Sequence, residues 1–439
     1  MGKVDVAVIG AGLSGMSAAF YLRQKGIGCR IFEKQSVPGG HAVTLEEAGY
    51  RFDRTGHLLH LDDPELLAQA LAWIGPEHRS IERRSMVWSH GVYTRYPFQA
   101  NVHGLPPDVA YACVMGFIEA QRQTPRPVTN FEEFCRAVFG KGISEHFMIP
   151  YNARLWGVPP HEISADWCQR FVPVPTLEDV IAGAVGLPSR ELGYNVRFVY
   201  PNRGIGELSA GLARAVGDIE LGRAPQRIDT SARELHFEDE TLAYRVLVNT
   251  APLPAFVALS DAPPEVAHAA RRLRCTHLFY LDVALSTACG KPYHWVYVPE
   301  AKYPFYRVGC YSNFSPEMAP EGKAGLYVEL VDRTEPDLDA VMPEVAAALV
   351  EMGFIARAGD IAFVRKRRID HAYVIFDHDH YPSLEVVRAF LESRAIVSTG
   401  RYGGWNYSSM GDALRFGREA AERAVEALSI GGSVEPTPL

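Results

Sequence analysis

The chain has 439 residues, of which 47% are hydrophobic and 22% charged, and its formal net charge is −8. This is the composition of a globular protein of two or three packed units, and the negative charge argues against a nucleic-acid surface, which would have to attract phosphates. No run approaches the ~20 apolar residues that span a bilayer. The seven cysteines are scattered without a CxxC pattern, so the sequence predicts no metal site and a reduced, cytoplasmic protein.

The N-terminal residues predict one βαβ unit. Residues 4–10 form a short apolar run that ends in glycine, which is typical of a buried parallel strand. Residues 14–24 have helical spacing, and residues 29–33 predict the second strand. The chain is then mainly helical from about 64 to 184. Further strands are expected at 87–96, 197–200, 219–221, 246–250, 278–286, 295–298, 305–311, 326–331 and 395–399, with a C-terminal helix at about 412–428.

Residues 10–15 read Gly-Ala-Gly-Leu-Ser-Gly, a GxGxxG motif placed between the first strand and the first helix. Gly10 permits the tight turn, Gly12 lets the backbone approach a pyrophosphate, and Gly15 lets the helix pack on the strand. The helix N-terminus at Leu13 and Ser14 offers N–H groups and a positive dipole end to the phosphate. The motif therefore predicts a dinucleotide site.

An acidic residue closes the second strand, because Glu33 stands 23 residues after Gly10. At this place an acid accepts hydrogen bonds from the hydroxyl groups of an adenosine ribose. Lys34 follows directly and is included in the predicted site. The alternative interpretation is a glycine-rich turn followed by a surface glutamate.

Two further segments favour FAD over NAD. A second glycine pair follows the acidic strand end, as in the FAD family similar to amine oxidases and glutathione reductase, where it lies along the flavin side of the cofactor. That family also closes its FAD site near the C-terminus with a strand, a glycine and a helix N-terminus. The predicted cofactor residues in these two segments are Gly39, Gly40, His41, Gly400, Arg401, Gly411, Asp412 and Ala413. Three separated segments thus predict FAD as the cofactor.

Motifs outside these segments resemble the UDP-galactopyranose mutase family, especially its eukaryotic-type branch. The resemblance runs from about residue 4 to about residue 425 and includes Tyr-Pro-Phe-Gln-Ala-Asn and Pro-Tyr-Asn-Ala-Arg-Leu-Trp. The motifs lie at residues 53–57, 95–101, 139–143, 149–159, 167–170, 194–206, 295–316, 367–373 and 400–407. By this resemblance Gly56 and His57 lie beside the isoalloxazine ring of the flavin. A buried structural histidine is the alternative for His57.

The same resemblance implies how a nucleotide sugar is held. The ring of Tyr96 would stack on a uracil, and the amide of Gln99 would meet its edge. Arg170 and Arg307 would hold the diphosphate, since a guanidinium makes bidentate bonds to phosphate oxygens, and Asn195 would orient the sugar. The remaining substrate-binding residues implied are Tyr151, Asn152, Trp156, Trp295, Tyr297, Tyr373 and Tyr407. A role in the hydrophobic core is the alternative for Trp156.

The fold class expected is α/β, with a discontinuous Rossmann-type FAD-binding domain, an inserted mixed or antiparallel β-sheet domain and a helical cap. The FAD-binding domain would combine residues 1–62, 197–250 and 390–430. Residues 63–196 would form the mainly helical cap that binds the nucleotide, and residues 251–389 the sheet domain that binds the substrate. The glycine- and proline-containing tail, residues 431–439, is expected to be disordered.

The resemblance implies an isomerase that interconverts the pyranose and furanose forms of a nucleotide sugar, with N5 of reduced FAD as the nucleophile on the anomeric carbon. Its partners would be a nucleotide-diphosphate sugar, UDP-linked by the resemblance, and an electron donor that reduces the flavin; a homo-oligomer is compatible with the sequence. One segment departs from the family, because Ser409-Met410-Gly411-Asp412 resembles generic amine-oxidase-like flavoproteins. The alternatives are therefore an oxidase of the amine-oxidase or protoporphyrinogen-oxidase kind, or an FAD enzyme with another reaction on a nucleotide sugar.

Overall fold

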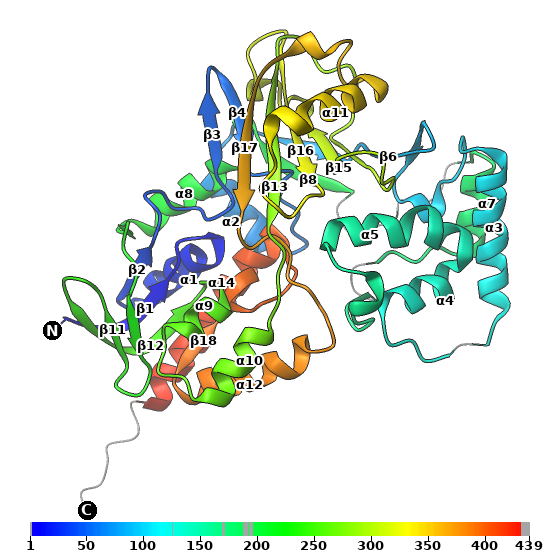
Figure 1. The fold of residues 1–439 in the computed structure, drawn as a ribbon. Helices are drawn as coiled ribbons and strands as arrows, with labels where there is room; N and C mark the ends of the chain where they lie inside the picture. The colour runs from blue at the N-terminus through cyan, green and yellow to red at the C-terminus, as the bar shows by residue number, and fades with distance from the viewer. Residues whose placement is uncertain (1, 125, 169–171, 188–191, 193–195, 432–439) are drawn as a thin grey trace, which may run out of the picture.

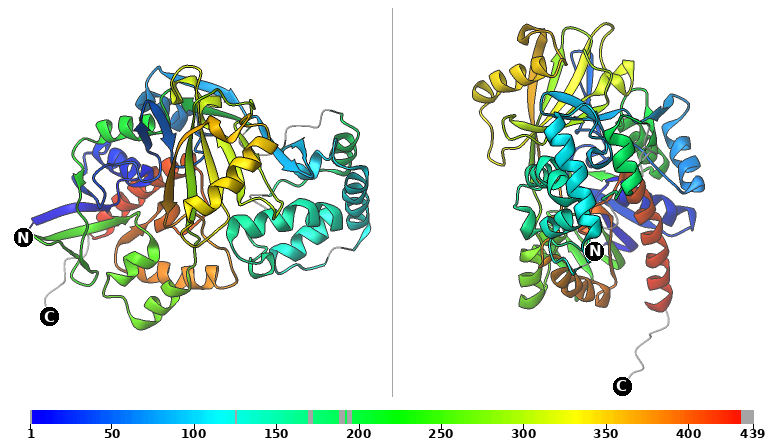
Figure 2. Two further views of the ribbon diagram at one scale, coloured as in Figure 1. Left: turned by 45° about the horizontal axis from the view of Figure 1, so that its top comes forward. Right: turned by 90° about the vertical axis from the view of Figure 1, so that its right-hand side faces the viewer.

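The computed structural model describes residues 2–124, 126–168, 172–187, 192 and 196–431. Within these residues the chain forms two seven-stranded sheets, with helices around them and a group of helices at one side (Figures 1 and 2). This is the predicted α/β class, with a Rossmann-type unit and a second, mixed sheet. The division into domains at the expected residue boundaries stays a prediction.

The first sheet has the strand order β10-β11-β12-β1-β2-β9, and β18 also pairs with β12. Its central pairs β1–β2, β1–β12 and β12–β18 are parallel, whereas β10, β11 and β12 are antiparallel neighbours. Its strands are β1 (Gly2–Ile9), β2 (Cys29–Glu33), β9 (Glu220–Leu221), β10 (Arg227–Asp229), β11 (Glu234–His236), β12 (Thr241–Asn249) and β18 (Ile396–Ser398). Segments from the start, the middle and the end of the chain thus share one sheet, which makes the Rossmann-type unit discontinuous.

Both faces of this sheet are covered by helices, which explains the buried apolar run at Val6–Ile9 in the second half of β1. Val6 and Val8 pack into one hydrophobic cluster, and Ala7 and Ile9 pack into another on the opposite face. Helices on the first face are α1 (Leu13–Gln24), α2 (Pro64–Ile74), α8 (Gly206–Val216) and α14 (Met410–Gly431). Helices on the second face are α9 (Leu253–Ala258), α10 (Pro264–Arg272) and α12 (His380–Ser393). A parallel sheet buried on both faces needs apolar residues at every position.

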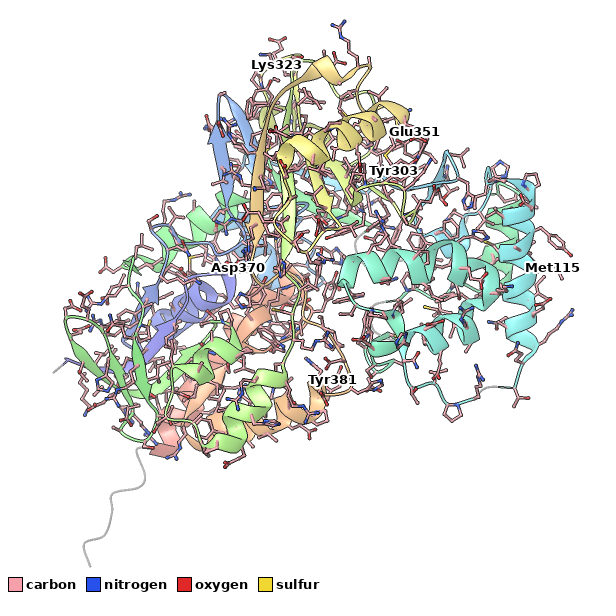
Figure 3. The ribbon with its side chains drawn as sticks, viewed as in Figure 1. Met115, Tyr303, Lys323, Glu351, Asp370 and Tyr381 are labelled. Atoms are coloured by element: carbon pink, nitrogen blue, oxygen red, sulfur yellow. The ribbon has the colours of Figure 1, made fainter. Side chains whose placement is uncertain are left out.

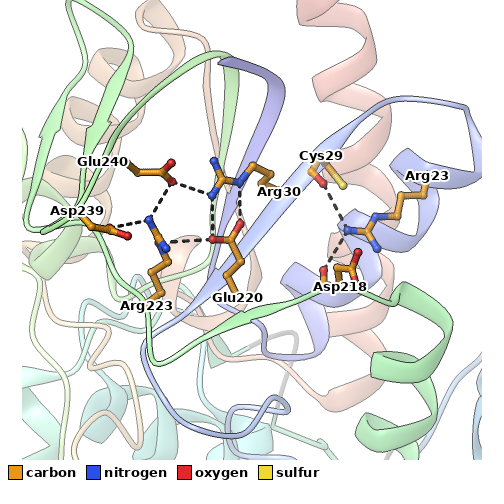
Figure 4. Close-up of polar contacts among 8 residues, drawn as sticks. All are labelled: Arg23, Cys29, Arg30, Asp218, Glu220, Arg223, Asp239 and Glu240. Carbon is orange, nitrogen blue, oxygen red and sulfur yellow. Dashed lines mark hydrogen bonds and ion pairs between the residues drawn. The ribbon is translucent and has the colours of Figure 1, made fainter. Parts of the chain in front are cut away.

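A network of ion pairs closes the outer edge of the first sheet at β9 (Figure 4). Arg30 on β2 reaches Glu220 and Glu240 at 2.7 Å each, and Arg223 reaches Glu240 at 3.0 Å and Asp239 at 2.7 Å. Charged side chains on an edge strand hinder pairing with another chain. The network therefore ties the short strand β9 to its neighbour and protects the edge.

The second sheet has the strand order β17-β13-β16-β15-β14-β6-β7, and all its pairs are antiparallel except β14–β6. Its strands are β6 (Ser85–Ser89), β7 (Val92–Arg95), β13 (Leu278–Leu285), β14 (Trp295–Tyr297), β15 (Phe305–Cys310), β16 (Ala324–Leu330) and β17 (Ile361–Ile369). The expected mixed or antiparallel sheet is confirmed. The strands β6 and β7 lie where extended structure was expected, at residues 87–96 within the mainly helical segment, and β6 pairs with β14 far along the chain.

Alternation along these strands separates an apolar face from a polar one. Phe279, Leu281 and Val283 of β13 pack in one cluster with residues of α11 (Leu338–Glu351). Tyr280 and Asp282 point to the opposite face, as the two-residue period of a strand requires. Both remain buried, so this second face is covered by other parts of the protein.

The helical segment carries α3 (Pro107–Arg122), α4 (Phe131–Ile143), α5 (Ile149–Trp156) and α7 (Leu177–Ala184), with a π-helical turn at Ser144–Met148. A Cβ added at Gly140 would lie 1.9 Å from the carbonyl oxygen of Gly116, so glycines allow α3 and α4 to cross closely. The remaining elements are β3 (Thr44–Glu47), β4 (Tyr50–Asp53), β5 (His78–Glu82), β8 (Arg197–Pro201), α13 (Gly400–Gly403) and short 3₁₀ turns. In the described part of the chain, none of the helices is apolar over a membrane-spanning length.

Candidate active site

Three glycine-containing segments meet at the N-terminus of α1. Gly12 forms a parallel bridge with Gly39, and a Cβ added at Gly40 would lie 3.3 Å from the Cα of Gly12. At Gly400, a Cβ would lie 2.7 Å from the hydroxyl oxygen of Ser14. The segments that were predicted to hold the cofactor are thus in direct contact, although they come from opposite ends of the chain.

The glycines are required by space as well as by backbone conformation. Gly10 has φ +95, and a Cβ there would lie 2.3 Å from the hydroxyl of Thr250. A Cβ at Gly15 would lie 1.9 Å from the carbonyl oxygen of Gly10. The helix that starts here has no side-chain cap and no acidic residue in its first turn. Its first N–H groups at Leu13 and Ser14 are therefore suited to an anionic group such as the FAD pyrophosphate.

Glu33 is fixed at the end of β2 by two backbone N–H groups. Its Oε2 accepts from Ala11 at 2.8 Å, and its Oε1 accepts from Gln35 at 2.9 Å. A carboxylate has about four lone pairs, so each oxygen keeps acceptor capacity for a ribose hydroxyl. Its contact with the ribose stays a prediction, as does that of the exposed Lys34.

Basic side chains surround the meeting point of the three segments. Burial, together with the nearby His57, Arg54 and Arg401, lowers the pKa of His41 to about 3. Burial is the largest cause of this shift, and the smaller contribution comes from cations gathered at one place, which favour an anion there. The uncapped helix, the glycine contacts and the basic side chains all fit FAD, whose pyrophosphate carries two negative charges.

The loop at residues 53–57 is anchored through Asp53. This buried carboxylate accepts from the hydroxyls of Thr44 and Tyr200, at 2.6 Å each, and from the backbone of Ile205 at 3.1 Å. Burial raises the pKa of Asp53 to about 6 in spite of these hydrogen bonds. Thr55 within the loop has φ +69, a conformation that β-branched residues rarely adopt. The hydrogen bonds to Asp53 therefore hold a strained loop in place.

His57 at the end of this loop lies between the cofactor segments and the second sheet. Burial, Arg401 and Arg307 lower the pKa of His57 to about 4, in that order of effect. Its Nδ1 is buried and has no hydrogen-bond partner among the described residues. Hydrogen bonds with the backbone at Thr55 and Arg54 act on the pKa in the opposite direction, so the alternative of a structural histidine is kept beside the predicted role.

Arg307 forms the central ion pair of the second sheet. Its Nε donates to Oε2 of Glu329 at 2.9 Å, and its Nη2 donates to Oε1 at 2.5 Å and to the hydroxyl of Tyr373 at 3.1 Å. Burial alone would lower the pKa of Arg307, but Glu329 and the nearby tyrosine hydroxyls more than offset it, so the pKa is raised well above its usual range. Glu329 was not predicted. Its signal in the sequence is a lone acid within the otherwise uncharged β16, every residue of which is buried.

Tyr327 is a second residue that the sequence did not indicate. It pairs with Gly309 on the neighbouring strand β15. A Cβ at Gly309 would lie 2.2 Å from the Tyr327 ring, and a Cβ at Gly56 would lie 2.3 Å from its hydroxyl. The ring therefore crosses β15 above Gly309 and contacts the loop that carries His57. The glycine two residues after Arg307 is the signal that could have revealed it.

Predicted substrate residues from three elements form an aromatic cluster around Tyr297. Its ring centroid lies 4.7 Å from that of Tyr96 and 5.3 Å from that of Tyr151. Trp295, two residues earlier on β14, has its ring centroid 6.5 Å from that of Tyr297 and 6.2 Å from that of Phe314. The structure thus brings Tyr96, Tyr151 and Tyr297 together, while the substrate contact of Trp295 stays a prediction.

A second aromatic group continues from this cluster. Trp156 lies 5.8 Å from Tyr373 and 6.1 Å from Tyr407, measured between ring centroids. The guanidinium of Arg401 stands over the rings of Tyr373 and Tyr407, at 5.6 and 5.0 Å. Asn152 accepts from Nε1 of Trp156 at 3.3 Å and fixes the indole. Trp156 therefore contacts the two tyrosines that the sequence assigned to the substrate.

Gln99 is buried, with one end of its amide engaged. Its Nε2 donates to the carbonyl of Pro173 at 2.8 Å, and its Oε1 is buried without a partner among the described residues. An amide held in this way presents an acceptor. Arg170 and Asn195 lie outside the described residues, so their predicted roles are unchanged.

The C-terminal part of the cofactor site is held by its own contacts. Arg401 donates to the carbonyls of Ala372 and Ser408 at 2.8 Å each. Asp412 accepts from the backbone and the hydroxyl of Ser409 at 2.9 and 2.8 Å, so it caps α14. The cofactor contacts of Arg401, Gly411, Asp412 and Ala413 stay predictions.

Comparison with known proteins agrees with this geometry. A family of NAD(P)-binding Rossmann-like domains matches residues 8–71. A crystal structure of reduced UDP-galactopyranose mutase is similar with a TM-score of 0.89 and 25% identity, covering 98% of this chain and 96% of that one. The zeta-carotene-forming phytoene desaturase of Myxococcus xanthus is 24% identical over 427 residues, 82% of this chain and 80% of that protein. The phytoene dehydrogenase of Streptomyces griseus is 41% identical over 75 residues, which span 17% of this chain and only 14% of that protein.

The chain has the fold of UDP-galactopyranose mutase, within the amine-oxidase-like FAD superfamily. This confirms the family resemblance that the motifs indicated. The Rossmann-like domain and the flavoprotein relatives support FAD as the cofactor, which confirms that prediction as well. The comparisons establish a flavin oxidoreductase-like enzyme with a UDP-galactopyranose mutase fold.

Proposed function

We propose that this protein is a nucleotide-sugar mutase that interconverts the pyranose and furanose forms of a sugar linked to a nucleoside diphosphate. The observation that carries the proposal is the buried Arg307–Glu329 pair, surrounded by aromatic residues and placed beside His57 and Arg401. A cation held in this way is suited to a diphosphate. An apolar substrate of a desaturase has no use for it.

The contacts of Arg307 leave one side of its guanidinium for a ligand. Glu329 occupies the side formed by Nε and Nη2, and Nη2 also reaches Tyr373. The remaining donors are on Nη1, in a fork whose plane the carboxylate fixes. We infer that Nη1 and the hydroxyl of Tyr373 bind the departing diphosphate and keep it close to the sugar.

The nucleotide would lie among the aromatic residues. The rings of Tyr96, Tyr151 and Tyr297 offer faces for stacking on a base. The unpartnered Oε1 of Gln99 would accept from a base N–H such as the imide of uracil. The same rings exclude water, which would otherwise capture the sugar once the diphosphate has left.

Bound FAD in its reduced form supplies the nucleophilic N5 that this reaction requires. The protein's part is to hold the cofactor through the three glycine segments and to place His57 and Arg401 next to it. His57 is uncharged near neutral pH, since burial and two arginines lower its pKa to about 4. It can therefore exchange a hydrogen bond with the sugar without adding a charge.

The test uses the FAD-loaded enzyme reduced with dithionite under anaerobic conditions. Conversion of UDP-galactofuranose to UDP-galactopyranose over many turnovers, without stoichiometric use of an electron acceptor, supports the proposal. No conversion, together with no binding of UDP, would contradict it. A survey of UDP, dTDP and GDP sugars by the change in flavin absorbance, in both redox states, identifies the base.

A flavin oxidase or desaturase is the second candidate. It is favoured by the likeness to the Myxococcus xanthus desaturase over 82% of this chain and 80% of that protein. It is also favoured by the Ser409–Asp412 cap at the start of α14, where the mutase motif is missing. It predicts steady substrate oxidation with release of peroxide or with use of an acceptor. Oxygen uptake during turnover separates the two candidates.

A further inference from the structure

We infer that Arg154 and Arg333 are positioning residues, which join the helix α5 to the second sheet and so set the aromatic residues against Arg307. The role in substrate binding rests on the proposed function, whereas the joint itself is a property of the fold. Neither arginine is among the residues that the sequence motifs assigned to the substrate or the cofactor.

Arg333 follows β16 and binds the C-terminal end of α5. Its Nη2 donates to the carbonyls of Arg154 at 2.6 Å and Leu155 at 2.8 Å, and its Nη1 donates to the carbonyl of His277 at 2.9 Å. The last carbonyls of a helix have no partner within it, and the helix dipole favours a cation there. Arg333 therefore caps α5 from the side of the second sheet.

Gly157 makes room for this cap. It ends α5 with φ +67, and a Cβ at this position would lie 2.6 Å from Nε of Arg333. A side chain here would meet both backbone strain and the guanidinium. The glycine after Trp156 in the sequence motif is thus explained by the arginine that packs on it.

Arg154 makes the opposite contact, from the helix to the sheet. Its Nη2 donates to the carbonyls of Tyr303 and Phe305, at 2.7 Å each, where the chain enters β15 (Tyr303 is labelled in Figure 3). Burial lowers the pKa of Arg154 to about 10, and it remains charged at neutral pH. The two arginines thus form a reciprocal clamp, in which each element donates to backbone carbonyls of the other.

The clamp is made through backbone carbonyls. Among the described residues neither arginine forms a close ion pair, although Glu300 favours the charge of Arg154 and Asp332 lies beside Arg333, and the Nε of each arginine is buried without an acceptor. Burying a cation in this way costs more than packing an apolar side chain of the same size. What the guanidinium adds is a fixed fork that prescribes one orientation of its acceptors. The arrangement therefore indicates that the two arginines orient α5 on the sheet and are not there mainly to stabilise the contact.

The orientation of α5 relative to β15 matters because both elements carry residues of the candidate site. Tyr151 and Trp156 stand on α5, three residues before and two residues after Arg154. Arg307 stands on β15, two residues after Phe305, whose carbonyl accepts from Arg154. The clamp thus fixes the distance between the aromatic residues and the guanidinium that we propose binds the diphosphate.

The test uses Arg154→Met and Arg333→Met in the FAD-loaded protein, with Arg136→Met as the control. Arg136 lies in the same helical segment but pairs with Glu132 at the surface. We expect UDP to bind about tenfold more weakly to each Met variant and unchanged to the control. The double variant should be little weaker than either single one, because both act on one joint. Arg333→Lys should recover part of the loss.

Hydrogen exchange separates positioning from general stability. Faster exchange confined to residues 149–157, with unchanged FAD absorbance and unchanged exchange in α1 and α14, supports the clamp. Exchange that rises through the whole chain with loss of FAD would overturn it, as would variants that bind UDP and exchange like the wild type. If the wild-type protein does not bind UDP, the proposed function fails, and exchange at residues 149–157 still decides whether the clamp exists.

Discussion

The two sheets build their parts of the site in opposite ways. At the first sheet the predicted cofactor site is made of backbone, where loops come so close at Gly12, Gly40 and Gly400 that side chains are excluded. At the second sheet the site is made of side chains on one face, paired across strands, as in Arg307 with Glu329. The first kind of site depends on consecutive residues, and the second on residues that only strand pairing brings together.

This difference determines which substitutions each region tolerates. A backbone site fails when a side chain is added, because N–H groups must stay open and close approach must be kept. A side-chain site fails when one partner of a pair is removed, because the other is left buried and unpaired. Four predictions follow from this contrast, in order of decreasing expected effect.

The largest effect is expected for Arg307→Ala. Glu329, which is fully buried, would lose its bidentate partner, and the free energy of unfolding should fall by about 3–5 kcal/mol. Urea denaturation measures the change. Arg365→Ala on β17 is the control, because its pair with Glu47 is exposed and should contribute less than about 1 kcal/mol. Equal effects of the two changes would remove the distinction between the buried and the exposed pair.

In the first sheet, Gly15→Val should weaken FAD binding by about 100-fold or more. A Cβ at this position lies 1.9 Å from a backbone oxygen, which cannot move aside as a flexible side chain can. Titration of the apoprotein with FAD, followed by fluorescence, gives the affinity. Gly28→Ala in the same βαβ unit meets open space and should bind FAD like the wild type. Normal FAD affinity in Gly15→Val would show that the close contact is not needed.

Gly309→Ala tests a glycine that serves the second sheet. The added methyl group would overlap the ring of Tyr327 and should lower the free energy of unfolding by about 2 kcal/mol. Removing the ring should relieve the overlap, so Gly309→Ala should cost almost nothing in a Tyr327→Ala background. Strict additivity of the two changes in urea denaturation would argue against the contact.

The smallest effect concerns His294, which precedes β14. Its ring is fully buried, and burial together with Arg84 lowers its pKa to about 4. The unfolded chain takes up a proton near pH 6.5, so stability is complete above this pH and falls as the pH drops towards 4. His294→Asn keeps an acceptor for the N–H of Arg84 and should lose about 1 kcal/mol less between about pH 7.5 and 5.8. Parallel stability curves for the two proteins would contradict this.

Much of the first sheet could be predicted from the sequence. The strand at residues 29–33 and the helix at residues 14–24 agree with β2 and α1 to within one residue, because their apolar periodicity is local. The GxGxxG motif correctly predicted the turn between β1 and α1 for the same reason. The pairing of β6 with β14 could not be predicted, since parallel pairing between strands about 200 residues apart leaves no local pattern.

Only some residues of the candidate site at the second sheet could be predicted from the sequence. The resemblance named Arg307, Tyr297 and Tyr373, but not Glu329 or Tyr327. Both of the missed residues lie on β16, whose seven residues are all buried and gave only the signal of a core strand. An acid and a tyrosine in such a strand can be recognised as site residues only when their cross-strand partners, Arg307 and Gly309, are known.

The sequence by itself determined the Rossmann-type unit, because this depends on glycines and apolar runs whose spacing is local. It indicated the cofactor and the superfamily through the resemblance of its glycine segments to a known family. Only the tertiary structure decided which charges are paired, which face of the second sheet is polar, and how Arg154 and Arg333 hold α5 against β15. The physical reason is that a backbone turn is a local property of a few residues. A buried ion pair or a guanidinium–carbonyl bond exists only after distant segments have packed and excluded water.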